Sequence, residues 1–354
     1  AKEQYHVALE SFLNLSVIFE TLSDWLRISK LANGLEPTMS NVECSGLNLW
    51  PLFKEEWHSS VTGAPSILGI LNFNLFEVAI RMLPTQRIGL YLYEQQSWEL
   101  GLISAWKARS HGTVIGVQHS TMLDWDMRYF HDPRSYQRLD NNDLPMPDKV
   151  AVNGPVIMEK SLEAGYPKEN LCEVEALRYL YLSDLASEES GSAYKSSDCL
   201  TLLVLGDYLE SNTKIQMGLL ETTLRQFPRK ISIIVKPHPA YLIEPLDYPS
   251  INFSVTTGPL KDTLDNCDVA YTSPVTSAAV DAYCFGIPVI TALDPNSLNL
   301  SPLRNYDEVH FVSSPAELSE ALFIVDSNRS ESDVKQQFFT LDSGLVRWKK
   351  LLLS

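Results

Sequence analysis

The sequence predicts an α/β protein of two doubly wound domains, each with a parallel sheet covered by helices on both faces. Three observations predict this fold class. From about residue 60 onward, short apolar segments of strand length alternate with segments of helical periodicity. The alternation stops in a polar, Ser-rich and acidic stretch at 183–198 and restarts at residue 199. A chain of 354 residues also exceeds one ordinary core, so two domains are expected.

The charge, the cysteine content and the apolar segments of the chain argue against several classes of function. The formal net charge of −16 argues against nucleic-acid binding, because phosphate contacts need a basic face, but a local basic cluster could still receive an anionic substrate. Five scattered cysteines without a C-x-x-C pair predict neither a disulfide framework nor a zinc site, and fit a reducing compartment. Because no apolar run reaches the roughly 18 residues of a membrane span, we expect a cytoplasmic protein.

The first domain is predicted to cover residues 1–182. Its first 60 residues read as mostly helical or irregular. The predicted strands that follow are 87–94, 113–120, 148–154 and 171–177, and the predicted helices are 66–83, 97–112 and 155–165. Pro155 lies at the start of the last helix and Gly165 follows its end, as is typical of helix termini.

The second domain is predicted to cover residues 199–330 and to follow the linker 183–198. The predicted strands are 199–206, 230–236, 251–255, 268–273 and 287–293, and the predicted helices are 213–226, 259–267, 276–286 and 314–326. Residues 331–354 are predicted to end in a helix that packs back on the first domain. In such an architecture a ligand binds in the cleft between the domains, at the carboxyl ends of the strands.

Polar residues follow the strands of the second domain. Gly206 lets the backbone turn close to a ligand after the first strand, although an ordinary strand-to-helix turn would also use it. Lys236 and His238 end another strand in the sequence KPHP, where Pro237 and Pro239 stiffen the turn and limit where the imidazole points. The lysine and histidine offer positive charge to a phosphate, or form a rigid surface turn.

A hydroxyl-rich junction follows the strand at 268–273. Thr272 and Ser273 end this strand, and Thr276 and Ser277 begin the next helix, where hydroxyls and free backbone N–H groups can bind an anion. The same groups could serve only as helix caps. Asp281, one turn into the helix, could accept hydrogen bonds from ribose hydroxyls or act as a favourable first-turn charge.

These motifs carry a resemblance to a known family. The KPHP turn, the junction at 272–277 and the segment DAYCFGIPVI at 281–290 resemble the nucleotide-binding half of GT-B glycosyltransferases, in particular bacterial enzymes that use CMP-activated acidic sugars. The stretches YLYEQQSWELGLISAW at 91–106, GVQHSTMLDWDMRYFHDPR at 116–134 and VEALRYLYL at 174–182 resemble surface-carbohydrate biosynthesis proteins, which include the retaining β-Kdo transferases. The likeness spans most of residues 50–300.

The resemblance implies a GT-B fold and a CMP-β-Kdo donor. His238 and Pro239 would contact the cytidine phosphate, and Thr272 with Ser273, or Thr276 with Ser277, would bind the phosphate. Kdo also carries a carboxylate, so a local basic patch is expected. Its candidates are Lys236, His238, Arg128 and Arg178, since arginine suits bidentate carboxylate recognition. No cofactor and no metal are implied, and Lys236, His238 and the helix at 276 would neutralise the departing CMP.

Retention implies a covalent Kdo–aspartate intermediate formed from the first domain. Asp126, in the loop after strand 113–120, is the predicted nucleophile. Its rivals are Asp124, Glu94, Glu55 and Glu56, and Glu94 or Glu56 could instead serve as a base or bind the acceptor. His119 would orient Asp126 or the Kdo carboxylate, or be a satisfied histidine beneath the loop.

The expected partners are CMP-Kdo and a lipid-linked glycan acceptor of the lipopolysaccharide O-antigen or capsule, with no nucleic acid. Two alternatives stay open: a GT-B transferase with another CMP- or CDP-activated donor, such as a CMP-sialic-acid-like or CDP-glycerol-like compound, and a non-catalytic binding module. The basic, apolar tail LVRWKKLLLS at 345–354 could touch the inner face of the membrane, or simply pack as a terminal helix. A chain starting at Ala1 is also compatible with one module of a larger glycosyltransferase.

Overall fold

The computed structural model describes residues 4–130, 144–183, 199–327 and 337–353. The predicted linker 183–198 lies, apart from Ser183, outside the described residues. Through its internal contacts the chain divides into two compact units, one of residues 1–117 with 134–150 and one of residues 118–133 with 151–354. The two larger sheets fall on either side of the predicted linker, whereas the contacts group residues 151–182 with the second sheet.

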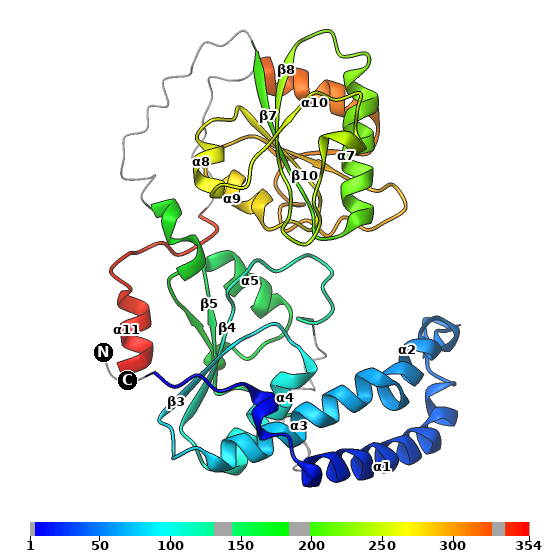
Figure 1. Ribbon diagram of the computed structural model, residues 1–354, viewed down its shortest axis with the longest axis vertical. Coiled ribbons are helices and arrows are strands. Elements are labelled where there is room, and N and C mark those ends of the chain that lie inside the picture. The colour runs from blue at the N-terminus through cyan, green and yellow to red at the C-terminus, as the bar shows by residue number, and fades with distance from the viewer. Residues whose placement is uncertain (1–3, 131–143, 184–198, 328–336, 354) are drawn as a thin grey trace. The chain divides into compact units, whose positions relative to one another are not determined.

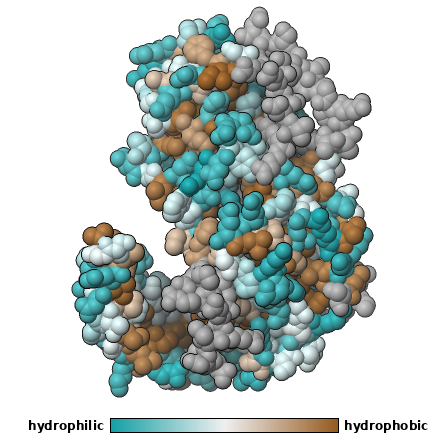
Figure 2. Space-filling model, turned by 180° about the vertical axis from the view of Figure 1, so that it is seen from behind, coloured by the Kyte–Doolittle hydropathy of each residue, from teal (hydrophilic) through white to brown (hydrophobic). Residues whose placement is uncertain are grey.

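Three helices build most of the first part of unit 1, α1 (Leu15–Met39), α2 (Trp50–Thr62) and α3 (Ala64–Met82), after a short 3₁₀ turn at Leu9–Phe12. Asn14 caps α1 by accepting a hydrogen bond of 3.1 Å from the Val17 backbone N–H. Figure 1 shows α1 running beside α2 and α3, and the indole N–H of Trp25 donates to the Thr62 carbonyl at 3.1 Å. Several apolar side chains of these helices are exposed, and Figure 2 shows hydrophobic colour on them.

A small hairpin that the sequence did not predict joins α1 to α2. Its strands are β1 (Glu43–Cys44) and β2 (Leu47–Asn48), which pair antiparallel. Ser45 and Gly46 between them have φ values of 51° and 78°, the left-handed conformation that a tight two-residue hairpin turn requires.

A four-stranded sheet follows in the order β3-β4-β5-β6, made of β3 (Ile88–Leu92), β4 (Thr113–Val117), β5 (Lys149–Val152) and β6 (Leu171–Glu173). β3 and β4 are parallel, with Ile88 opposite Thr113. Helix α4 (Ser97–Ala108) connects them, and α5 (Pro155–Glu163) with the 3₁₀ turn Lys168–Asn170 connects β5 to β6. A further 3₁₀ helix, η4 (Leu177–Leu182), comes after β6. The elements predicted here are all present, with strands shorter than predicted.

The second sheet has six parallel strands in the order β12-β11-β10-β7-β8-β9. They are β7 (Leu200–Leu205), β8 (Ile231–Lys236), β9 (Ser254–Val255), β10 (Val269–Thr272), β11 (Val289–Ala292) and β12 (His310–Val312). The helices are α7 (Glu210–Leu224), α8 (Leu260–Leu264), α9 (Ala278–Cys284) and α10 (Pro315–Ser327), and a 3₁₀ turn lies at Pro245–Asp247. Figure 1 shows α7 and α10 on one side of the sheet and α8 and α9 on the other.

This double covering explains the sequence of β7. Leu202, Leu203 and Val204 are consecutive and each fully buried, because side chains on both faces of the strand meet helices. Met217 and Leu220 of α7 and several residues of α10 share one core with the sheet. Burying each such side chain stabilises the fold by about 1.5–3 kcal/mol relative to leaving it exposed.

The last described segment returns to the region around β5 and β6 within unit 2. The Thr340 N–H donates to the Asn153 carbonyl at 3.0 Å, and the Ala176 N–H donates to the Thr340 carbonyl at 2.8 Å. The buried Glu175 carboxylate accepts the backbone N–H groups of Arg347 at 2.7 Å and Trp348 at 3.0 Å, which begin helix α11 (Val346–Leu353). Phe339 stacks on Tyr179 with ring centroids 3.8 Å apart.

Membrane spans were sought in the described ranges. None of their single helices has both the length and the apolar character to cross a bilayer. Helices α2 and α3 meet those requirements only when taken together across a bend of 40°.

Candidate active site

The carboxyl ends of three neighbouring strands in the second sheet lie at one level. Leu205, the last residue of β7, pairs with Lys236 of β8 on one side and with Thr272 of β10 on the other. Adjacent strands are about 4.8 Å apart, so the loops that begin at Gly206, Pro237 and Ser273 leave the sheet side by side. The sheet order reverses between β7 and β10, and such a switch point is where open α/β sheets bind ligands.

Asp207 organises this edge, a role that the sequence reasoning missed. Its carboxylate is fully buried and accepts hydrogen bonds from the Ser273 hydroxyl, from the Asn212 amide at 2.9 Å and from the Leu209 backbone N–H at 2.9 Å. The sequence did contain a signal for this role, since an aspartate directly follows a predicted buried strand. Gly206 packs tightly beside Asp207, since a Cβ on residue 206 would lie 3.0 Å from the backbone nitrogen of His238.

His238 lies at the turn after β8 with a defined ring orientation. Its Nδ1 accepts the Ala240 backbone N–H at 3.1 Å, so in the neutral ring the hydrogen resides on Nε2 and can be donated to a ligand. The Tyr208 ring meets the imidazole edge-on at 6.1 Å, and Pro239 is exposed beside it. The Lys236 amine donates to the Gly258 carbonyl, and burial lowers the pKa of this amine.

The four hydroxyl groups that were predicted to bind the phosphate differ in burial and in hydrogen-bond partners. The Thr272 hydroxyl is fully buried and shares a 3.0 Å hydrogen bond with Thr291 inside the sheet. The Ser273 hydroxyl donates its hydrogen to Asp207. Thr276 is buried and Ser277 half-buried, and both precede α9, which has only seven residues. Ser277 is therefore the most accessible of these four hydroxyl groups for an anion.

Residues after β6 meet the start of α9. Arg178 of η4 donates to the Ser277 hydroxyl at 3.5 Å, and the Tyr181 hydroxyl donates to the Asp281 carboxylate. Burial raises the pKa of Asp281 to about 6, against the lowering effects of Tyr181 and the Arg178 charge. The structure thus brings together two predicted donor-binding residues that are distant in the sequence, Arg178 and Ser277, and adds Tyr181, which the sequence reasoning did not single out.

A cavity of about 290 Å³ opens at the same edge of the sheet. Its walls come from the first turns of α7, from the loop after β10 and from the loop after β11. They comprise Leu209, Ser211, Asn212, Ile215, Pro274, Val275, Ala292, Asp294, Ser297, Leu298 and Leu300. Apolar side chains with a few hydroxyl, amide and carboxylate groups form a surface suited to a sugar-sized ligand.

The loop after β4, residues 118–130, is fastened to the wall of this cavity. The Asp124 N–H donates to the carbonyl of Leu300, a residue that lines the cavity, at 3.1 Å. The Asp124 carboxylate forms ion pairs with Lys160 at 2.7 Å and with Arg304 at 3.5 Å. The Arg304 guanidinium also lies 5.3 Å from the ring centroid of Trp125, whose φ of 60° is unusual for a bulky residue.

Asp126 pairs with Arg128 in the same loop. The Arg128 Nε lies 2.9 Å from Oδ1 and Nη2 lies 2.6 Å from Oδ2, so the carboxylate is held by two guanidinium nitrogens. The Asp126 side chain is 11% exposed and that of Arg128 is 48% exposed. His119 lies half-buried at the start of this loop, next to the buried Gln118.

The remaining acidic candidates belong to unit 1. Glu94 follows β3, and its backbone N–H donates to the Glu99 carboxylate at 2.9 Å. Glu99 lies in the first turn of α4, where its buried carboxylate also accepts the backbone N–H of the N-cap residue Gln96 at 2.8 Å, and burial raises the pKa of its carboxyl. Glu55 and Glu56 are exposed on α2. The catalytic roles of Glu94 and Glu56 stay predictions.

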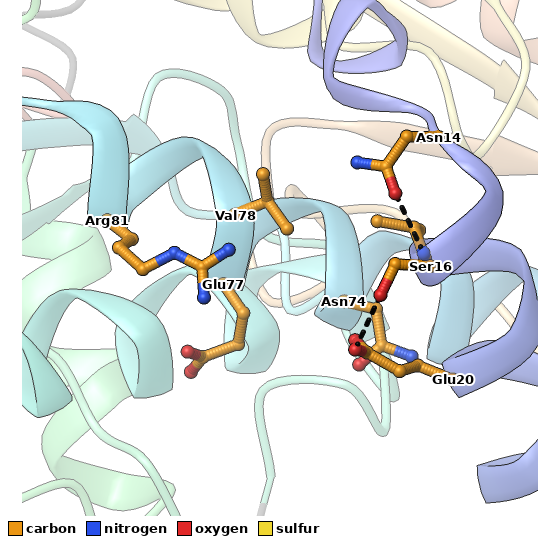
Figure 3. Close-up of a pocket in the computed structure, with 8 residues that line it drawn as sticks. Asn14, Ser16, Glu20, Asn74, Glu77, Val78 and Arg81 are labelled. Carbon is orange, nitrogen blue, oxygen red and sulfur yellow. Dashed lines mark hydrogen bonds between the residues drawn. The ribbon is translucent and has the colours of Figure 1, made fainter.

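A second cavity, of about 220 Å³, lies between α1 and α3 in unit 1. Figure 3 shows Asn14 and Ser16 entering it from the start of α1, and Asn74, Glu77 and Arg81 from α3. Across the described parts of the chain, no three His, Cys, Asp or Glu side chains gather as metal ligands would, and metal independence stays a prediction.

Comparisons with known proteins address the fold. No family model and no curated protein sequence matches the chain. Two solved structures match over most of their length. The UDP-GlcNAc 2-epimerase of Methanocaldococcus jannaschii has a TM-score of 0.51 at 14% identity, covering 82% of this chain and 84% of that one. A Listeria monocytogenes protein assigned as a UDP-N-acetylglucosamine 2-epimerase has a TM-score of 0.53 at 11% identity, covering 86% and 84%.

The fold is GT-B. This confirms the predicted fold class, an α/β chain with two Rossmann-like domains. Identities of 14% and 11% establish the fold alone. Any inference about the donor, the acceptor or the stereochemistry therefore has to be drawn from this chain's own residues.

Proposed function

We propose that the protein is a glycosyltransferase that transfers Kdo, a 2-keto sugar acid, from CMP-β-Kdo to a sugar of a lipid-linked surface glycan, with retention and without a metal. The observation that carries the proposal is the grouping at the switch point of the second sheet. There His238 Nε2–H, the Ser277 hydroxyl and the Arg178 guanidinium offer donors to a phosphate, next to a sugar-sized cavity whose wall holds the loop of Asp124 and Asp126.

The two aspartates of this loop have different surroundings, which favours Asp126 as the nucleophile. Asp124 is shared between Lys160 and Arg304, and its side chain is 14% exposed, close to the 11% of Asp126, so the two carboxylates differ in their partners and not in their burial. A carboxylate held by two cations in a half-buried position serves to anchor the loop. Among the described residues, the Asp126 carboxylate pairs with one cation, Arg128, whose side chain is 48% exposed.

In the proposed reaction, an Asp126 oxygen forms a bond to the anomeric carbon while the bond from that carbon to the CMP phosphate oxygen breaks. The electron pair of the broken bond leaves with CMP, and Lys236, His238 and Arg178 offset the charge that develops on the phosphate. An acceptor hydroxyl then attacks the same carbon, the bond to Asp126 breaks, and the hydroxyl proton passes to a base. Two inversions give net retention. Glu94 and Glu56 remain the candidates for the base, and His119 would orient Asp126 or the Kdo carboxylate.

The decisive experiment is intact-mass spectrometry after incubation with CMP-Kdo alone. We expect a mass increase of one Kdo residue in the wild-type chain and none in Asp126→Asn, while Asp124→Asn still forms the adduct if it remains folded. An adduct that persists in Asp126→Asn would refute the nucleophile assignment. Absence of adduct and of transfer in the wild-type chain would refute the proposed function.

Nucleotide specificity gives an independent test. Thermal-shift measurements with CMP, CDP and UDP should show the largest stabilisation with CMP, and UDP is the important comparison because both proteins of similar fold are named for a UDP-sugar. A preference for CDP would favour a CDP-activated donor, and no response to any nucleotide would favour a non-catalytic binding module. His238→Ala should weaken CMP binding, and an unchanged affinity would remove this side chain from the phosphate site.

A further inference from the structure

The Asp126–Arg128 pair has the same geometry as the recognition of a free carboxylate by arginine. Both carboxylate oxygens lie within hydrogen-bond distance of the guanidinium, at 2.9 Å from Nε to Oδ1 and 2.6 Å from Nη2 to Oδ2. The Arg128 backbone N–H also donates to Oδ1 at 3.2 Å. Two nearly parallel N–H···O contacts are the arrangement by which arginine selects planar carboxylates.

The pair lies close to the sugar-sized cavity. Asp124 bonds through its backbone N–H to Leu300 in the cavity wall, and Asp126 is two residues further along, at most about 7 Å between Cα atoms. The anchors of Asp124 to Lys160 and Arg304 keep this part of the loop in place. Arg128 is 48% exposed, so its long side chain can turn toward a ligand while the loop backbone stays fixed.

We propose that Asp126 occupies the carboxylate-binding position of Arg128 until a carboxylate-bearing sugar displaces it. This inference rests on the proposed function and adds to it a determinant of substrate class. A donor sugar with a carboxylate takes over the two guanidinium contacts, and the same exchange leaves the Asp126 oxygens free to react. A nucleotide-activated neutral sugar cannot make the exchange, so Asp126 stays paired and unreactive. Selection of acidic sugars and exposure of the nucleophile are then one event.

The exchange predicts an unusual result for Asp126→Asn. Removing the internal competitor should tighten binding of CMP-Kdo, although the same substitution abolishes transfer. CMP, which has no sugar carboxylate, should bind as before. A partly exposed arginine–aspartate pair contributes a few tenths to about 1 kcal/mol, so the ratio of the dissociation constants of CMP and CMP-Kdo should rise about two- to five-fold.

The experiment is isothermal titration calorimetry with CMP and with CMP-Kdo on four forms of the full chain. These are the wild type, Asp126→Asn, the double variant Asp126→Asn/Arg128→Gln and the control Asp24→Asn. Asp24 pairs with Arg27 at 3.1 Å in unit 1, so the control also breaks an aspartate–arginine pair and changes the net charge by the same amount. Circular dichroism verifies that each variant is folded.

The decisive quantity is the dissociation constant of CMP divided by that of CMP-Kdo. The proposal is supported when this ratio rises in Asp126→Asn, stays at the wild-type value in Asp24→Asn, and falls to or below that value in the double variant. A ratio unchanged in Asp126→Asn, or raised equally in both single variants, would overturn it. Transfer by the wild-type chain is measured separately. A wild type that transfers no Kdo, combined with a raised ratio in Asp126→Asn, would refute the proposed function and leave the exchange standing.

Discussion

Replacing Asp281 by Asn should stabilise the protein at neutral pH, because the buried carboxyl is costly to ionise. Burial raises the pKa of Asp281 from an ordinary value of 3.8 to about 6, with Tyr181 and Arg178 opposing the rise. A carboxyl whose pKa is raised in the folded state contributes stability that is fully present below pH 3.8 and lost as the pH rises through 6. The difference of about 2.2 pH units, at 1.36 kcal/mol each, corresponds to about 3 kcal/mol.

Asparagine keeps an oxygen that can accept the Tyr181 hydroxyl but carries no charge. The variant should therefore exceed the wild type in unfolding free energy by about 3 kcal/mol near pH 7.5 and by about 1 kcal/mol near pH 4.5. Thermal unfolding followed by circular dichroism between these pH values measures the effect. For a unit of this size we expect a Tm difference of about 6–12 °C at the upper pH.

Tyr181→Phe provides the matched comparison. It removes the hydrogen bond that lowers the pKa of Asp281, so the stability of this variant should fall more steeply with rising pH than that of the wild type. A difference between wild type and Asp281→Asn that does not change between pH 4.5 and 7.5 would refute the reasoning, since any non-ionic effect of the substitution is independent of pH.

Three further substitutions test single contacts. Gly206→Ala should lower the free energy of unfolding by about 1–3 kcal/mol and weaken CMP binding, because the added Cβ would lie 3.0 Å from the backbone nitrogen of His238. Urea unfolding measures the first effect and calorimetry the second. Glu175→Gln should cost about 1–3 kcal/mol in urea, since one of the two N–H groups at the start of α11 loses its acceptor, and a change below 0.5 kcal/mol would contradict this role. Asp124→Asn should make the loop 118–130 more sensitive to limited proteolysis, because the Lys160 amine loses its ion pair at 2.7 Å; unchanged cleavage would exclude the anchoring role.

The fold could be predicted because its main signal is local. Alternation of apolar strands with amphipathic helices is visible along the chain, and the strands β7 and β10, buried except for the half-buried Thr201, are almost continuously apolar. Two elements had no such signal. The hairpin at 43–48 is exposed and only two residues long on each side, and β12 is a three-residue strand whose existence depends on pairing with β11. Pairing between distant segments leaves little trace in a short sequence window.

The site could be predicted only as a set of strand ends. Residues that directly follow strands, such as Gly206 and His238, share one edge because parallel strands end there. Their mutual contacts depend on tertiary packing, so the hydrogen bond that Asp207 accepts from the Ser273 hydroxyl and the one that Asp281 accepts from Tyr181 could not be read from the sequence. The difference between Asp124 and Asp126 likewise arises from Lys160 and Arg304, which lie far away in the chain.

The placement of residues 338–348 has a consequence for how the chain folds during synthesis. Phe339 and Thr340 lie against Gly154, where a Cβ would collide with their backbone, and Glu175 has its backbone partners at Arg347 and Trp348. A ribosome makes residues 153–176 well before these partners emerge. At about 5–20 residues per second, this part of the nascent chain waits roughly ten to thirty seconds with the Glu175 carboxylate and the neighbouring apolar surface still uncovered. We expect this interval to be when the growing polypeptide depends most on chaperones.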